Sequence, residues 1–249
     1  MSSRADSKQA AREARVAAER EEAAKQRRQR VWALAGGAAL LAAIVVVVLI
    51  LVSAGGSDGD GEASGELAQF DGIPQSGIEL GDPQAPVTLV EFADPQCPFC
   101  RDYTADVMPG LIEQYVAPGD LRMELQLLTF IGPDSEAIAR AAQAAGEQDL
   151  LWQFMDVAYA RQGVENSGYA DQSFIDGAGE AAGVDVEEMN ASVESAAVTK
   201  ALEDAQAAAA DAGINSTPSF LVGPTGGELE PVPQDGLAGA IDEALAGAK

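Results

Sequence analysis

A run of 23 uncharged and mostly apolar residues, 31–53, divides this chain into two parts of opposite charge. A helix rises about 1.5 Å per residue, so a run of this length spans a hydrocarbon core of about 30 Å. Arg27, Arg28 and Arg30 precede the run, and Trp32 stands where an interfacial aromatic residue is expected. We therefore predict a single transmembrane helix, with a charged cytoplasmic segment at 1–30 and the rest of the chain outside the cell membrane.

A cleaved signal peptide is the alternative interpretation, because Val52-Ser53-Ala54 is similar to a small-residue cleavage site. The apolar run and the segment before it are both long for a signal, which favours an uncleaved anchor. Either interpretation exports the C-terminal part. Residues 54–69 are rich in Gly, Asp and Ser and predict a flexible acidic linker. The soluble domain then covers 70–249, which is long enough for one well-buried core.

Charge and composition exclude several classes of function. Residues 54–249 contain six Lys/Arg and thirty-five Asp/Glu, so this part would repel nucleic-acid phosphates. The chain contains no histidine, which excludes Ser-His-Asp and Cys-His catalysis and His-ligated metals. Two cysteines are too few for a zinc site made of cysteines alone. We expect no nucleic-acid partner, no metal and no cofactor.

Hydrophobic patterns after the linker alternate between strand and helix. An apolar, β-branched strand is predicted at 87–92, a helix at 98–115 and a second strand at 121–130. Residues 135–213 lack proline and have apolar residues at helical spacing, which indicates several helices. A short strand at 219–222 with a hairpin partner at 227–231, and a closing helix at 237–246, complete the chain. This order predicts an α/β layer fold.

Two cysteines, in Cys97-Pro98-Phe99-Cys100, lie between the first predicted strand and the following helix. This spacing places Cys97 at the N-cap and Cys100 one turn on, and Pro98 suits the first helical position. Free N–H groups and the helix dipole would stabilise a thiolate at Cys97. Cys100 could then resolve a mixed disulfide. A structural disulfide is the alternative, but this pair closes too short a loop to stabilise much.

Two segments resemble the DsbA-like proteins of the thioredoxin superfamily. The stretch 87–101 is similar to their active-site segment, and Asn215-Ser-Thr-Pro-Ser-Phe-Leu-Val-Gly223 is similar to their cis-proline loop. A helical insertion, here at about 133–213, also distinguishes DsbA-like proteins from simple thioredoxins. The resemblance covers 70–249 and implies a thioredoxin-like α/β fold with a helical insertion.

The resemblance also implies roles for individual residues. Cys97 would attack, Cys100 would resolve, and Pro218 would be a cis-proline with the backbone of Thr217 facing the substrate. Glu91 matches a buried acid that would exchange protons with Cys100, although an exposed strand carboxylate is the alternative. Pro98 and Phe99 would contact substrate, with Phe99 offering an apolar surface. Many family members have histidine between the cysteines, so their oxidising strength does not carry over.

The resulting hypothesis is an extracytoplasmic thiol–disulfide oxidoreductase, anchored through 31–53, that oxidises cysteine pairs of exported proteins. By family analogy, a quinone-linked membrane partner would reoxidise it. A reductase or disulfide isomerase on the same scaffold is the first alternative. The second is a non-catalytic peptide-binding module, which the intact Cys97, Cys100 and Pro218 oppose. A Cu(I)-binding thiol pair is a minor fourth possibility.

Overall fold

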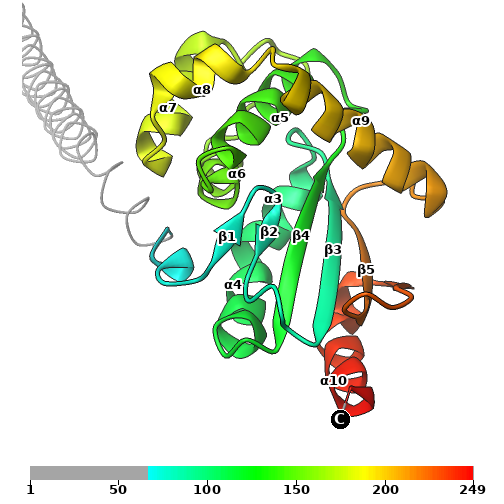
Figure 1. Cartoon of the computed structure of the whole chain (residues 1–249). Coiled ribbons are helices and arrows are strands. Elements are labelled where there is room, and N and C mark those ends of the chain that lie inside the picture. Colours follow the sequence, from blue (N-terminus) through cyan, green and yellow to red (C-terminus); the bar gives the residue numbers. More distant parts are fainter. Residues whose placement is uncertain (1–66, 249) are drawn as a thin grey trace, which may run out of the picture. The chain divides into compact units, whose positions relative to one another are not determined.

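A computed structural model describes residues 67–248 of this chain (Figure 1). Its centre is a six-stranded sheet in the order β1-β2-β4-β3-β5-β6. The two central strands, β3 (Val87–Ala93) and β4 (Leu121–Leu127), are parallel, and all other neighbours are antiparallel. The outer strands are β1 (Gln75–Ser76), β2 (Glu79–Leu80), β5 (Ser219–Pro224) and β6 (Glu230–Val232).

Helices cover both faces of the sheet, which explains why every residue of β3 is buried. Val90 and Phe92 pack against Ala205 and Ala209 of α9 (Ala196–Asp211) on one face. Leu89 belongs to the main core on the other face, together with residues of the helices after the cysteine pair and of α10 (Leu237–Gly247). A strand buried on both faces reads as a continuous apolar run, as this segment does.

The helix after the cysteine pair is shorter than predicted. The predicted helix at 98–115 is divided into α3 (Pro98–Asp106), α4 (Met108–Leu111) and the π-helical segment η2 (Ile112–Val116). Pro109 explains the break, because proline has no N–H to bond to Ala105 and its ring crowds that carbonyl. The prediction of one continuous helix was therefore wrong at Val107.

The helical stretch between β4 and β5 contains five helices: α5 (Pro133–Gly146), α6 (Leu151–Ala160), α7 (Gln172–Ala182), α8 (Val186–Ser192) and α9. Helices α5 to α8 form a layer at the end of the sheet where β3 ends (Figure 1). Helix α9 differs from the others, because its second half covers the sheet. The helical insertion predicted at about 133–213 is thus present, and it ends in a helix that belongs to the layered core.

Other boundaries differ by a few residues. The second strand ends at Leu127 rather than at residue 130, and alternating burial along it confirms the predicted period of two. The hairpin partner of β5 is β6 at 230–232, while 227–229 lie in the turn before it. Across 67–248, no helix combines the length and the apolar character that crossing a bilayer requires. The predicted segments at 1–30 and 31–53, and 54–66 of the linker, lie outside the described residues.

Candidate active site

Cys97 lies at the junction of β3 and α3, as the spacing predicted. It is the N-cap residue of α3, with Pro98 in the first turn, and its amide N–H donates to the carbonyl of Asp94 at 2.9 Å. Both Cys97 and Cys100 are free thiols, with exposed fractions of 5% and 0%. The helix start therefore presents one sulfur at the rim of the site and holds the other beneath it.

The surroundings of Cys97 favour its thiolate. A hydrogen bond with the Cys100 side chain is the main cause, and the Thr217 side chain and the amides of Cys100 and Phe99 add to it, so that the pKa of Cys97 falls to about 6 although burial opposes the shift. In its thiol form, Cys97 donates to the carbonyl oxygen of Thr217 at 3.3 Å. Hydrogen bonds, chiefly the one from Cys100, thus stabilise the Cys97 thiolate without a neighbouring histidine.

Cys100 has the opposite electrostatics. Burial raises its pKa well above the usual value, and the hydrogen bond to Cys97 and the charge of Glu91 raise it further. Because its pKa is raised, Cys100 takes up a proton readily once it is released from a disulfide as a thiolate. The two sulfurs are thus divided into a stable thiolate and a proton acceptor, which is the asymmetry that disulfide exchange needs.

Glu91 is buried, as the resemblance implied. It is 1% exposed, and burial raises its pKa to about 8. Its Oε1 atom has no hydrogen-bond partner among the described residues. The side chain points to the α3 and α6 side of β3, opposite to Val90 and Phe92, which resolves the question that strand alternation left open. A neutral carboxyl beside Cys100 is suited to exchange protons with it.

Thr217 and Pro218 are joined by a cis peptide bond, as predicted. They precede β5, which pairs with β3, and the contact between Thr217 and Cys97 described above places this loop against the reactive sulfur. Both residues are partly exposed. The loop therefore offers backbone groups next to Cys97 that a bound extended peptide can reach.

A buried polar network around Asp94 was not predicted from the sequence. Its Oδ1 accepts from the amide of Gln96 at 2.9 Å and from the hydroxyl of Ser135, and its Oδ2 accepts from the amide of Ile131 at 3.1 Å. Gln96 also donates to Ser135 at 2.9 Å. Asp94 is fully buried, so its carboxylate needs these hydrogen bonds. Together they connect the segment before Cys97 to the start of α5.

The segment after α6 also holds the cysteine loop. The Gln162 side chain donates to the carbonyls of Pro95 and Cys97 at 2.9 and 3.2 Å. The amide of Asn166 donates to the side-chain oxygen of Gln96 at 2.6 Å. Nothing in the local sequence around 162 or 166 indicates this role, because the partners lie more than sixty positions away. The helical insertion thus fixes the backbone at Cys97.

Phe99 and Arg101 lie outside this network. Phe99 is 69% exposed, in line with the predicted apolar surface. The Arg101 guanidinium forms an ion pair with Asp102 at 2.7 Å, so it is directed to a carboxylate rather than to the Cys97 thiolate. Within 67–248, no group of three or more His, Cys, Asp or Glu side chains is arranged to hold a metal ion.

The low pKa of Cys97 predicts a specific pattern of alkylation. In the reduced full chain, the rate of reaction with iodoacetamide should rise with a midpoint near pH 6, whereas an ordinary cysteine has a pKa of about 8.5. Mass spectrometry should find the label on Cys97, because Cys100 is buried and stays protonated. A midpoint above pH 8 would contradict a stabilised thiolate. Thiolate absorbance at 240 nm provides an independent measurement of the same titration.

Comparisons with known proteins agree with this geometry. The family described as Thioredoxin matches residues 75–243. A thioredoxin-like oxidoreductase from Silicibacter pomeroyi is 31% identical, with a TM-score of 0.55 over 72% of this chain and 95% of that one. The structure of oxidised BdbD from Bacillus subtilis, at 19% identity, shares the fold with a TM-score of 0.61 over 70% of this chain and 97% of that one.

A curated relative, the probable disulfide bond formation protein D of Bacillus anthracis, is 39% identical over 85 residues. The match covers 33% of this chain and 39% of that relative's length. The fold and the paired cysteines beside a cis-proline define a protein of the thioredoxin family, and the chain belongs to it. The structure of α-DsbA1 from Wolbachia pipientis also shares the fold at 17% identity, with a TM-score of 0.59 over 72% of this chain and 93% of that one.

Proposed function

We propose that this protein exchanges disulfides with exported proteins and acts mainly as their oxidant, with its domain outside the cell membrane. The single observation that carries the direction is the asymmetry of the two sulfurs. A thiolate stabilised at Cys97 lowers the free energy of the reduced form, and a stabilised reduced form makes the disulfide a stronger oxidant. The name of the relative from Bacillus anthracis, which refers to disulfide bond formation, supports the same direction.

The exchange follows from the positions of the sulfurs. A substrate thiolate attacks Cys97 Sγ of the disulfide form, the S–S bond breaks, and Cys100 leaves with the electron pair and takes a proton from Glu91. A second substrate thiolate then attacks the substrate sulfur of the mixed disulfide and releases Cys97 as a thiolate. The substrate thereby loses two electrons and gains a disulfide, and the protein becomes a dithiol. Thr217 and Pro218 would hold the substrate backbone during both steps.

Unfolded polypeptides are the substrate class that the surface favours. Large apolar side chains are exposed at Phe99, Phe130 and Val164. Phe99 lies in the cysteine loop itself. Hydrogen bonds from Ile131 to Asp94 and from Asn166 to Gln96 connect this loop to the segments that carry the other two side chains. Apolar surface beside exposed backbone suits extended chains without a fixed sequence.

The direction is tested by mixing the oxidised full chain, in mild detergent, with a reduced and unfolded test protein that has one cysteine pair. We expect the test protein to gain its disulfide while an equal amount of Cys97–Cys100 becomes reduced; the pre-reduced chain is the control. A reduction potential near about −120 mV would support an oxidant, and one near about −270 mV would support the reductase alternative. No exchange in either direction would leave the peptide-binding and Cu(I)-binding alternatives.

The membrane location rests on the apolar run at 31–53 and its basic flank. We expect protease added outside intact cells, after removal of the wall, to digest the domain at 67–248 and to spare the segment at 1–30. The reverse pattern would place the domain inside. Recovery of the domain in the medium would favour the cleaved signal. A quinone-linked partner that reoxidises the protein is proposed by family analogy.

A further inference from the structure

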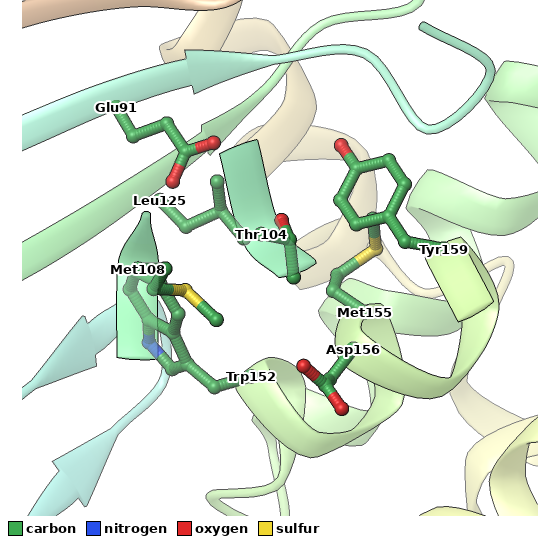
Figure 2. Close-up of a pocket in the computed structure, with 8 residues that line it drawn as sticks. All are labelled: Glu91, Thr104, Met108, Leu125, Trp152, Met155, Asp156 and Tyr159. Carbon is green, nitrogen blue, oxygen red and sulfur yellow. The ribbon is translucent and has the colours of Figure 1, made fainter. Parts of the chain in front are cut away.

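A small cavity lies between Glu91 on β3, Thr104 on α3 and Asp156 on α6 (Figure 2). Its volume, measured as the space open to the centre of a water molecule, is about 10 Å³. A cavity needs roughly this volume to hold one water, and the water needs two to four polar partners. The rest of its wall is apolar apart from Tyr159. The cavity therefore has room for a single water beside a buried carboxyl.

The polar groups around this cavity come from three elements. Glu91 supplies the Oε1 atom, which has no hydrogen-bond partner within 67–248, Thr104 supplies a hydroxyl, and Asp156 supplies a carboxylate on the other side (Figure 2). The Tyr159 hydroxyl is engaged elsewhere, because it donates to the carbonyl of Asp94 at 3.1 Å. Three groups that accept or donate hydrogen bonds thus face the space, which meets the needs of one bound water.

A second, larger pocket of about 160 Å³ begins where the cavity ends. Thr104, Asp156 and Tyr159 line both spaces, so these three residues form the wall between them. Gln69 and Arg101 lie on the outer side, and the Gln69 side chain donates to Asp156 Oδ1 at 3.1 Å. Asp156 is 8% exposed and therefore reaches both the interior and the outer pocket.

We propose that one water in this cavity and the Asp156 carboxylate form a proton route between Glu91 and the outer pocket, with the Thr104 hydroxyl holding the water. The inference rests on the proposed function and adds a positioning residue and a proton-transfer residue to it. Asp156 lies in the helical insertion, so the insertion supplies part of the proton chemistry as well as fixing the cysteine loop.

The route completes the proton balance of the exchange. When the disulfide opens, Cys100 leaves as a thiolate and takes the Glu91 proton, which leaves Glu91 ionised in an apolar site. The Asp156 carboxylate takes up a proton from solvent in the outer pocket and passes it to the water, as the water gives a proton to Glu91. Reoxidation runs the same transfers in reverse. No proton has to cross the apolar core, where an isolated charge is costly.

The titratable groups that face Glu91 are few. Cys100 and Tyr103 approach from α3, and Tyr159 and Asp156 approach from α6. The pKa values of Tyr103 and Tyr159 are raised well above the usual value by burial, so neither ionises near neutral pH. Among these groups, Asp156 and Tyr159 also line the pocket leading to solvent, and since the Tyr159 hydroxyl is bonded to the Asp94 carbonyl and does not ionise near neutral pH, Asp156 is left to carry the proton.

The test follows reduction of the oxidised full chain by dithiothreitol at pH 8, with acid quenching and alkylation of the released thiols. Asp156→Asn should slow the reaction at least tenfold and leave the reduction potential unchanged, because a relay alters rate and not equilibrium. Added imidazole, a small acid, should restore the rate of Asp156→Asn without accelerating the wild type. Asp106→Asn removes an exposed carboxylate at the end of α3 and should react like the wild type.

Double substitution separates a relay from a structural effect. Glu91→Gln should slow the reaction, and Asp156→Asn should add little in the Glu91→Gln background, because both act on one route. Thr104→Val should slow reduction by dithiothreitol and should also lower the solvent isotope effect on its rate. The route is wrong if Asp156→Asn reacts as fast as the wild type. It is also wrong if the effect of Asp156→Asn on the rate adds to that of Glu91→Gln and does not respond to imidazole. A wild type that exchanges no disulfide with dithiothreitol would instead overturn the proposed function.

Discussion

Replacing Cys97 by serine should lower the rate of disulfide transfer to a reduced test protein by at least about a thousandfold. Cys97 supplies the sulfur at the rim of the site, and its thiolate is stabilised. A serine hydroxyl forms no disulfide and does not ionise near neutral pH. Cys100 cannot replace it, because it is fully buried and its pKa is raised well above the usual value. The measurement is the initial rate of disulfide gain in the test protein, with the oxidised full chain as reference.

The Cys100→Ser variant is the matched control, since it removes the other sulfur from the same motif. It should react through Cys97 with a disulfide-bonded substrate and then remain as a mixed disulfide, because no resolving thiol is left. Non-reducing electrophoresis and mass spectrometry should find the adduct on Cys97. Adduct formation by Cys97→Ser at the same rate as by Cys100→Ser would contradict the assigned roles. Unchanged unfolding midpoints in urea for both variants would show that the fold is intact.

The features that could be predicted from the sequence are those fixed by short-range patterns. The apolar run at 87–92 and the spacing of Cys97 and Cys100 define a strand, a helix start and the order between them. The cis bond before Pro218 was predicted from resemblance, and the structure agrees. Alternation along 121–127 gave the orientation of β4, since its odd-numbered residues are buried. Each of these features depends on a few neighbouring residues.

The sequence does not show which residues from distant positions meet in the folded protein. Glu91, Thr104 and Asp156 occupy ordinary positions on a strand and two helices, and only the packing of α6 against α3 brings them to one cavity. Strands β1 and β2 have two residues each, too few to show a period. The break at Val107 differs from these features, because it depends on Pro109 alone, a residue within the predicted helix whose ring clashes with the preceding turn.

Replacing Glu91 by glutamine should make the oxidised protein progressively more stable relative to the wild type as the pH rises from 4.5 to 8. The pKa of Glu91 is about 8 in the fold, against a usual value of 4.5. Below pH 4.5 both the folded and the unfolded state hold the proton. Between pH 4.5 and 8 the unfolded state releases it and the folded state keeps it, so the free energy of unfolding falls by about 1.4 kcal/mol per pH unit. The loss approaches about 5 kcal/mol at pH 8.

Glutamine does not titrate, so Glu91→Gln should lack this pH dependence. Its amide needs partners in the buried site, which imposes a cost at every pH, so the decisive quantity is the change in the stability difference between pH 4.5 and 8. Urea unfolding of the oxidised full chain in mild detergent measures it, because the disulfide keeps both cysteines from titrating. Glu113→Gln, at an exposed position of η2, should follow the wild type. A difference that stays constant across this range would mean that Glu91 ionises normally, and the proton exchange with Cys100 would lose its basis.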